Sequence, residues 1–509
     1  MNNVEIKLKL RKLFYFKYCY FKRAEVSIMS TLKKNFLYVL LQQFVLMGLP
    51  FLTIPYISRV LGPHGVGHYS YSFSYTTLFI NVFLLGSNLY AIREIANVKS
   101  DSKQLSRSFS EIFLIRTGLL AIATVIYFIC VPLVWKGDAV FYWQSLNLIG
   151  AFFDITWLFQ GLEKFKKVVT RNITLKLLGF GSVFVFVKDE NDLVLYTIIM
   201  GAAVIIGNAA LFYRLNQYVR LVWHNTEFKR HFKQMLILFI PSFSAMIYSV
   251  LDKTMLGIMS TTDQVGFYEQ AYKIVYMISS LINISGVVML PRTSSLIAEK
   301  RFEKLMEVLR NGVTLTIFLV LPITFGFFVI SKDFVLWFLG DKFQPSGTIA
   351  MMMAPIIIFK SLGVIFGSWY LVPMRKNKEY TLPIVIGACL NFILNLALIP
   401  RFGAAGAAFA TTVTEGLILV IQLWFLNNVL KQKSYPMKAF VLYLLASIAM
   451  AIVSYEVALF FHLSLLLTIL LKVCVGIVVY SVILLLCREK VALGLVKKIF
   501  FLKAKVNSR

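Results

Sequence analysis

The sequence predicts an all-α integral membrane protein with about fourteen transmembrane helices, and two observations carry this prediction. Of the 509 residues, 59% are hydrophobic and only 15% are charged, whereas soluble domains average about 25% charged residues. Apolar runs recur along the whole chain, separated by short polar breaks. A run of about 20 apolar residues is long enough to cross a bilayer as a helix.

The apolar runs divide the chain into two halves around its longest polar break, residues 214–233. Six predicted spans precede this break, at residues 35–57, 66–90, 110–133, 139–160, 168–188 and 193–213. Eight follow it, at residues 234–258, 265–290, 309–331, 347–373, 380–400, 404–427, 438–461 and 464–487. Because no break is much longer than about twenty residues, no extramembrane domain is expected.

Lys and Arg gather in every second break, which predicts the orientation of the spans. Cytoplasmic loops carry an excess of these residues, and the intervening breaks are instead offset by acids such as Asp138, Asp189 and Asp333. Both termini are therefore predicted to be cytoplasmic. The basic segments are Lys33 and Lys34, Arg93 to Arg107, Lys164 to Lys167, Arg214 to Lys233, Arg292 to Arg310, Arg375 to Lys378, Lys431 to Lys438 and Arg488 to Lys498.

Residues 1–34 form a basic segment before the first span. The first span is too long to be the apolar part of a signal peptide. No cleavage is therefore expected. Met29 precedes a Ser-Thr-Leu-Lys-Lys sequence and is an alternative start, and the sequence leaves Met1 and Met29 both open.

Several function classes are disfavoured. A net charge of +28 would suggest a nucleic-acid partner in a soluble protein, but orientation in the membrane explains cations placed between spans. The sequence contains no Walker loop, His-Glu-x-x-His motif or paired cysteines, so neither an enzyme nor a bound cofactor is expected. His64 and His68 are four residues apart, but the glycines Gly62, Gly65 and Gly67 are expected to interrupt any helix there, so no metal site is predicted.

Ionisable residues inside the predicted spans mark the candidate site, because a charge at the centre of a membrane helix costs roughly 2.5 to 3.5 kcal/mol. Lys360 and Glu415 lie nearest the midplane. Basic groups outnumber acidic ones, and a positive cavity suits a pyrophosphate or an acidic sugar, whereas a cavity for cationic drugs should be acidic. The other candidates for substrate binding are Arg116, Asp154, Arg171, Lys176, Asp252, Lys253 and Lys273, and Lys472 is a further intramembrane charge.

Structural roles compete with these site roles. Arg116, Arg171 and Lys472 lie close enough to span ends to reach lipid headgroups, and Asp252 could simply neutralise its neighbour Lys253. Glu415 has two readings that the sequence leaves open: it pairs with a cation such as Lys360, or it takes up H⁺ or Na⁺ and couples transport to an ion gradient.

Six short motifs resemble the polysaccharide flippase family of the multidrug/oligosaccharidyl-lipid/polysaccharide exporter superfamily in order and spacing. The resemblance covers nearly all of residues 30 to 490. The motifs are Ile54 to Pro63, Gly65 to Gly67, Arg93 to Ala96, Trp157 to Glu163, Asp252 to Gly257 and Gly403 to Ala408.

This resemblance implies two pseudo-symmetric six-helix lobes around a central cavity. The lobes would comprise residues 35–213 and 234–427, joined by the cytoplasmic linker 214–233 and followed by two additional helices within 438–487 and a basic tail, 488–509. A weak repeat agrees with this division, since Val66 to Tyr69 and Val265 to Tyr268 open the second span of each half.

The resemblance also implies a function in a bacterial plasma membrane. Family members carry undecaprenyl-pyrophosphate-linked oligosaccharide repeat units from the inner to the outer leaflet, for capsule, O-antigen or exopolysaccharide synthesis, in contact with membrane lipids and with polymerase and chain-length machinery. One alternative is a cation-coupled multidrug exporter, and another is a membrane polymerase or glycosyltransferase. Span 1, residues 35–57, contains no charged side chain, which counts against a multidrug antiporter and a lipid II flippase. The short external breaks count against an enzyme.

Overall fold

The computed structural model describes residues 48–222, 228–431, 437–461 and 463–494, and no β-strand occurs among them. The first helix of the N-terminal lobe within these residues is Gly48–Leu84. It continues with α2 (Ser87–Val98), α3 (Ser102–Val134), α4 (Ala139–Phe152), α5 (Thr156–Gly161), α6 (Phe165–Phe186) and α7 (Leu193–Ala210). The C-terminal lobe contains α8 (Phe228–Met259), α9 (Thr262–Ala298), α10 (Phe302–Leu339), α11 (Gln344–Met353), α12 (Ile356–Val364) and α13 (Asn377–Lys431), and α14 (Met437–Leu459) and α15 (Leu465–Leu486) follow.

The all-helical membrane fold is confirmed. Among the described residues, seven helices are long and apolar enough to cross a membrane, or up to nine if each of two bent helix pairs counts as one span. Two of these helical stretches cover two predicted spans each. In the 55-residue α13, Gly403 is non-helical, with φ 53° and ψ −129°. Because a straight helix of this length would exceed 80 Å, against a hydrocarbon core of about 30 Å, the break at Gly403 is required if both halves lie in the membrane.

The helix Gly48–Leu84 contains a similar irregularity at Gly62, which has φ of 67°. The expected interruption by glycines is thus found at Gly62, before the two histidines, whereas the helix continues from His64 to His68. Their rings lie 6.0 Å apart.

Predicted spans 4 and 10 occupy equivalent places in the two lobes, and both are broken into two helices. Asp154 separates α4 from α5, and its side chain accepts hydrogen bonds from the backbone N–H and the hydroxyl of Thr156, at 3.0 and 2.6 Å, as in an Asx turn. Pro355 lies between α11 and α12, where the missing N–H of proline favours a break. The second break bends the chain by 47°.

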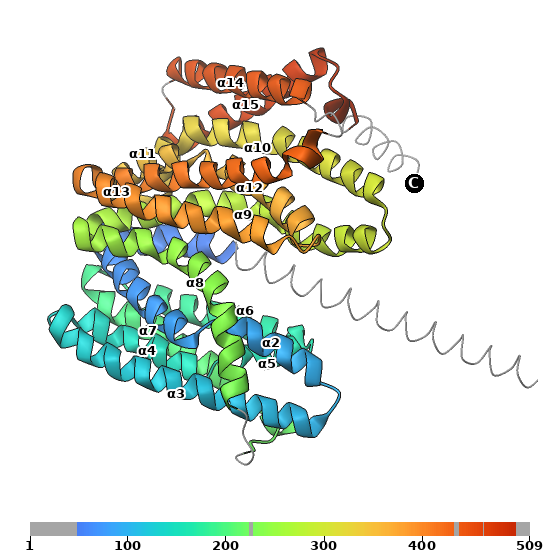
Figure 1. Ribbon diagram of the computed structural model, residues 1–509. Helices are drawn as coiled ribbons and strands as arrows, with labels where there is room; N and C mark the ends of the chain where they lie inside the picture. The colour runs from blue at the N-terminus through green and yellow to red at the C-terminus, as the bar shows by residue number, and fades with distance from the viewer. Residues whose placement is uncertain (1–47, 223–227, 432–436, 462, 495–509) are drawn as a thin grey trace, which may run out of the picture.

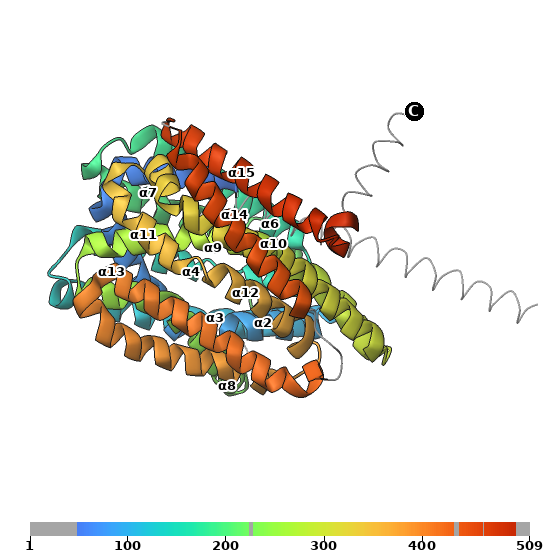
Figure 2. The same cartoon turned by 90° about the horizontal axis from the view of Figure 1, so that it is seen from above.

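The two lobes lie side by side, and α8 crosses from one to the other (Figure 1). Its first turns pack on α2 and α3, and it also packs on α9 and α13. His231, 1% exposed, holds the first turns of α8 in place through contacts of 2.6 Å to both Tyr90 and Glu111. In the view from above, α14 and α15 lie across α10 (Figure 2).

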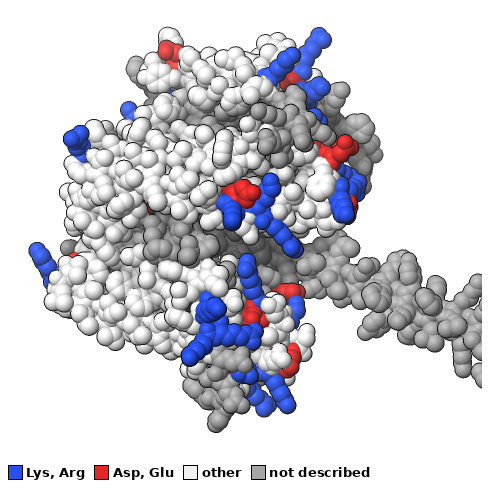
Figure 3. Space-filling model, viewed as in Figure 1, with Lys and Arg blue, Asp and Glu red and all other residues white. Residues whose placement is uncertain are grey.

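Loops that alternate along the chain meet at the same end of the bundle. At the end carrying the basic segments, here called the basic end, Lys99 pairs with Glu163 at 2.6 Å, and the backbone N–H of Arg220 donates to Ser106. At the opposite end, His68 contacts Asp138 at 3.0 Å. Lys and Arg gather toward one end of the visible face, beside a broad face without charge (Figure 3). This arrangement agrees with spans that cross the bilayer in alternating directions.

Candidate functional site

A cluster of three charges lies inside the C-terminal lobe. Lys253 of α8 and Lys273 of α9 each lie 3.1 Å from a carboxylate oxygen of Glu269, and the three side chains are 17%, 40% and 9% exposed. The residues on either side of Glu269 contact the N-terminal lobe: Tyr268 shares a buried cluster with Tyr196, and Gln270 donates to Ser58 at 3.0 Å. The cluster therefore faces the other lobe and carries one excess positive charge.

Lys360 and Glu415 form an ion pair between α12 and α13. The pair lines a cavity of about 270 Å³ together with Tyr276, Tyr380 and Gln422. The Lys360 ammonium lies 6.0 Å from the centre of the Tyr276 ring. Of the two readings of Glu415, the structure shows the pairing, and uptake of an ion remains a proposal.

A row of stacked tyrosines on α9 runs between these two charged groups. Tyr268 stacks on Tyr272 at 6.0 Å, and Tyr272 stacks on Tyr276 at 5.7 Å. The spacing of four residues places all three on one face of the helix. Tyr276 lines the Lys360 cavity, whereas Glu269 and Lys273 each follow a tyrosine of the row by one residue and lie on the adjacent face of α9.

Asp252 does not neutralise its neighbour Lys253, so that expectation is wrong. Asp252 is 4% exposed and accepts hydrogen bonds from Tyr268, from Asn395 at 2.6 Å and from Thr411 at 2.8 Å. These contacts connect α8, α9 and α13. Asp252 is therefore a packing residue of the lobe, and Lys253 pairs with Glu269 instead.

Arg116 lies in the interior of the N-terminal lobe and does not extend to lipid headgroups. It is 2% exposed and donates hydrogen bonds to Ser87 and Asn88, both at 2.7 Å. Its guanidinium lies 5.8 Å from the centre of the Trp157 ring. The indole N–H of Trp157 donates to the carbonyl of Asp154 at 3.0 Å, which places the α4–α5 break beside this ring.

The remaining candidates lie apart from the C-terminal cluster. On α6, Arg171 donates to Asn172 and Asn208, and Lys176 is half-buried on the same helix. Lys472 of α15 pairs with Asp333 of α10 at 2.6 Å, so it too is paired within the protein. The structure thus brings Lys253, Lys273, Lys360 and Glu415 together on one lobe and places Arg116, Asp154, Arg171 and Lys176 on the other.

Sequence reasoning missed Glu269, the acid that holds Lys253 and Lys273. The available signal was its spacing of four residues from Lys273, which places both on one face of α9. No group of three or more His, Cys, Asp or Glu side chains suited to a metal ion occurs within the described ranges.

The two lobes touch directly at the end opposite the basic end. Gly67 and Gly266 approach so closely that a Cβ on Gly67 would lie 1.8 Å from the carbonyl oxygen of Thr262. Close by, His64 contacts the hydroxyl of Thr262 at 2.8 Å, and Gln270 donates to Ser58 at 3.0 Å. We call these residues the lobe contact. Its two glycines belong to the repeated motifs found in the sequence.

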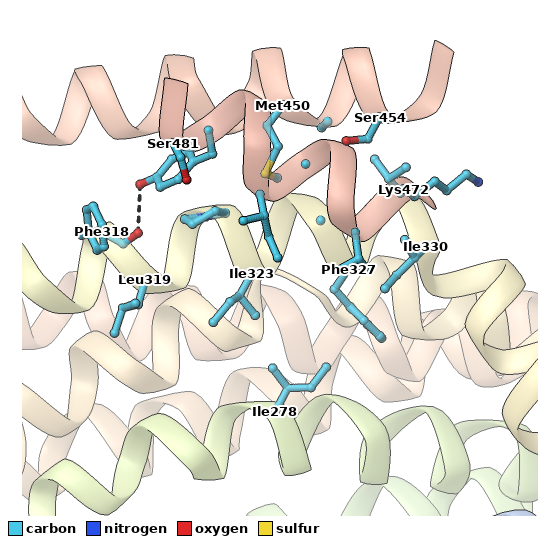
Figure 4. Close-up of a pocket in the computed structure, with 18 residues that line it drawn as sticks. Ile278, Phe318, Leu319, Ile323, Phe327, Ile330, Met450, Ser454, Lys472 and Ser481 are labelled. Carbon is cyan, nitrogen blue, oxygen red and sulfur yellow. Dashed lines mark hydrogen bonds between the residues drawn. The ribbon is translucent and has the colours of Figure 1, made fainter. Parts of the chain in front are cut away.

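An apolar groove of about 470 Å³ runs between α10 and the added helices α14 and α15. Ile323, Phe327 and Met450 line its middle, and Lys472 lies at one end (Figure 4). Near the other end, the hydroxyl of Tyr480 donates to the carbonyl of Phe318 at 2.9 Å. The groove is thus an apolar channel along the outside of the C-terminal lobe, with a polar group toward each end.

The fold is that of a multi-pass transporter. It matches the solved structure "Lipid II flippase MurJ, inward closed conformation" with a TM-score of 0.71 at 16% identity, covering 89% of this chain and 99% of that one. It also matches an outward-facing multidrug resistance MATE transporter of the MOP superfamily with a TM-score of 0.52 at 13% identity, covering 79% of this chain and 97% of that one.

Two family models each match more than half of the chain: "Polysaccharide biosynthesis protein" over residues 32–297 and "Lipid II flippase MurJ" over residues 180–477. The chain therefore belongs to the polysaccharide flippase family of the multidrug/oligosaccharidyl-lipid/polysaccharide exporter superfamily. A "Putative O-antigen transporter" of Escherichia coli (strain K12) is 25% identical over 411 residues, covering 78% of this chain and 97% of that protein.

The matched MurJ region does not include span 1, whose lack of charge was expected to separate this chain from lipid II flippases. Residues 35–47 of that span also lie outside the described residues. The relation to the lipid II flippases is therefore evident in the later spans, and the prediction from span 1 remains a prediction.

Proposed function

We propose that this protein is a flippase that carries undecaprenyl-pyrophosphate-linked oligosaccharide repeat units from the inner to the outer leaflet, for capsule, O-antigen or exopolysaccharide synthesis. The observation that carries the proposal is the cluster of Lys253, Glu269 and Lys273, which faces the N-terminal lobe with an excess positive charge. A charge held partly away from bulk water attracts an anionic group strongly, and a pyrophosphate is such a group.

The apolar groove beside α14 and α15 supports a lipid-linked substrate. A polyprenyl chain is apolar and cannot leave the bilayer without cost, because each buried CH₂ contributes about 0.8 kcal/mol. A groove on the outside of the lobe would let this chain stay in an apolar environment while the charged head and the glycan occupy the space between the lobes. The substrate would then cross head first, with its tail following.

Alternating access of the two lobes is the proposed mechanism. The lobe contact at the opposite end would close the external side in the state observed, and the substrate would load from the cytoplasmic side. Opening of the lobe contact would release the head group outward. Both termini would be cytoplasmic in a bacterial plasma membrane, and the polymerase and chain-length machinery of the pathway would act on the product.

The multidrug exporter is the second candidate, supported by the MATE-like fold. The charge of the cluster argues against it, because two lysines and one glutamate would repel a cationic drug. In the proposed function the protein transports its substrate and catalyses no reaction. If transport is coupled to an H⁺ or Na⁺ gradient, Glu415 is the proposed site of that coupling.

The experiment is export of glycan in cells that depend on this protein. Lys253→Gln with Lys273→Gln should lower export at least tenfold, with the protein still present in the membrane. Lys253→Arg with Lys273→Arg keeps the charge and should retain most export. Full export by the glutamine variant would contradict the role of the cluster, and equal loss in both variants would indicate a packing role.

A further inference from the structure

A second groove, separate from the one beside α14 and α15, lies between α6 and α7 and has a volume of about 580 Å³. Lys166, Lys167 and Arg171 line it at the basic end of α6. Farther along, its lining is apolar and includes Leu175, Leu178 and Ile206. The groove therefore combines a cationic mouth with an apolar floor.

The cations at the mouth have hydrogen-bond donors that could bind an anionic ligand. Arg171 uses its two terminal nitrogens on Asn172 and Asn208, whereas its Nε is buried and has no hydrogen-bond partner. Lys167 lies over the rings of Phe159 and Tyr218, at 5.1 and 4.5 Å from their centres. Lys166 is exposed. A buried donor without a partner is costly, so an acceptor in the groove would stabilise this arrangement.

The length of the groove fits a lipid of one leaflet. From Lys166 to Leu178 the α6 helix advances about 18 Å at 1.5 Å per residue, which is slightly more than half of the roughly 30 Å hydrocarbon core. An acyl chain of a phospholipid spans this half. A C55 polyprenyl chain is several times longer than an acyl chain of usual length, so most of it would lie outside the groove.

We propose that the α6–α7 groove binds one anionic glycerophospholipid of the inner leaflet. Its phosphate would lie among Lys166, Lys167 and Arg171, and an acyl chain would lie along Leu175 and Ile206. Basic pockets between membrane helices on the cytoplasmic side are suited to such headgroups. The proposal uses the predicted orientation of the basic end and is independent of which substrate the protein carries.

A bound lipid would stabilise the N-terminal lobe. Arg171 holds Asn208 of α7, and Asn208 donates to the carbonyl of Gly150 in α4 at 2.7 Å. A phosphate that fixes Arg171 would therefore hold α4, α6 and α7 together. The lipid would act as a resident structural ligand, distinct from the transported molecule.

The test measures thermal unfolding of the purified full chain in detergent, with phosphatidylglycerol or phosphatidylcholine of matched acyl chains added. Phosphatidylglycerol should raise the unfolding midpoint of the wild type more than phosphatidylcholine does. Lys166→Gln with Lys167→Gln should weaken the apparent affinity about tenfold to thirtyfold, since each cation near a lipid surface contributes about 1 kcal/mol. Ile206→Trp, which fills the floor, should also weaken it. The matched control, Lys300→Gln with Lys304→Gln, removes two exposed cations of another basic segment and should respond as the wild type does.

Three results would overturn the proposal. The first is that both lipids raise the unfolding midpoint of the wild type equally, and the second is that the Lys300 and Lys304 control loses as much affinity for phosphatidylglycerol as the Lys166 and Lys167 variant does. The third is that farnesyl diphosphate stabilises the protein and phosphatidylglycerol does not. If a variant does not fold, a photoactivatable phosphatidylglycerol on the wild type decides the question. It should label peptides of α6 and α7, and labelling confined to other helices would refute the groove. Neither readout is transport, so failure here leaves the proposed flippase function untouched.

Discussion

Asp252 shows how an acid inside a membrane span can find its hydrogen-bond partners within the protein. Its carboxylate accepts from Tyr268, Asn395 and Thr411, which come from two other stretches of the C-terminal lobe. Replacing it with alanine removes this shared acceptor from a buried place, and a buried donor that loses its partner costs about 1 to 3 kcal/mol. Asn395 and Thr411 keep second acceptors, the side chain of Asn391 at 3.1 Å and the carbonyl of Ala407 at 2.8 Å.

We expect Asp252→Ala to lower the free energy of unfolding by about 1 to 3 kcal/mol and to lower the amount of protein in the membrane. Thermal unfolding in detergent measures the effect. Asp341→Ala, at an exposed acid, is the control and should change little. An Asp252→Ala protein of normal stability that has lost transport would show instead that Asp252 contacts the substrate.

The Lys360 and Glu415 pair predicts a rescue. Breaking a buried ion pair by removing one partner typically costs 3 to 5 kcal/mol, because the other charge remains buried. Glu415→Gln should therefore impair stability and glycan export, and Glu415→Gln with Lys360→Met should recover much of both. If Glu415 instead couples an ion, the double variant stays inactive while its stability recovers, and export by Glu415→Gln no longer depends on the ion gradient.

Some of these residues could be predicted from the sequence, because counting residues from the start of a span gives the depth of a side chain in the membrane. Lys360 and Glu415 were recognised by their position near the midplane, and the structure places them in contact. Depth does not give the direction in which a side chain points. The pairing of Lys253 with Glu269 depends on how α8 packs on α9, which the sequence pattern does not contain.

At the scale of elements, the second predicted span of one lobe meets the second predicted span of the other at Gly67 and Gly266. Gly67→Ala places a methyl group against the backbone of Thr262, so it should separate the lobes at the lobe contact. The side chain of Ser58, 0% exposed, should then become accessible. In a background without native cysteines, Ser58→Cys should react several-fold faster with a membrane-impermeant maleimide when Gly67→Ala is present.

The control for this experiment is Gly118→Ala, because a Cβ at Gly118 would meet no atom within 4 Å. It should leave the labelling rate unchanged. An unchanged rate with Gly67→Ala as well would mean that the contact yields locally and does not hold the lobes together.

Breaks within spans were the elements that hydropathy could not predict. Spans 4 and 10 read as single apolar runs, yet each is two helices. Asp154 and Pro355 mark the breaks, and both residues are visible in the sequence. A hydropathy average over a window of about 20 residues does not reveal a break caused by a single aspartate or proline. The breaks at Gly62 and Gly403, which fall between predicted spans, were easier to place.

At the scale of the whole molecule, the charge pattern predicts the topology. Reporter fusions after Arg107, Lys167 and Arg310 should report the cytoplasm, and fusions near Asp138 and Asp341 should report the outside. The contacts between alternate loops at each end agree with this arrangement. A single fusion with the opposite signal would shift the number of spans by one and reverse every later loop.

The sequence predicted the all-helical membrane fold because the apolar composition and the spacing of basic segments are properties of the whole chain. It could not predict that α8 crosses between the lobes or that α14 and α15 form a groove with α10. Those features depend on which helix faces meet.

The most direct test of the account is transbilayer movement by the purified protein in liposomes. A labelled undecaprenyl-pyrophosphate-linked oligosaccharide should become accessible to a membrane-impermeant reagent faster in the presence of the protein. The Lys253→Gln and Lys273→Gln double variant should approach the rate of empty liposomes, and a cationic dye should not be transported. Movement of the dye without movement of the glycan-linked lipid would contradict the proposed flippase and favour the multidrug exporter.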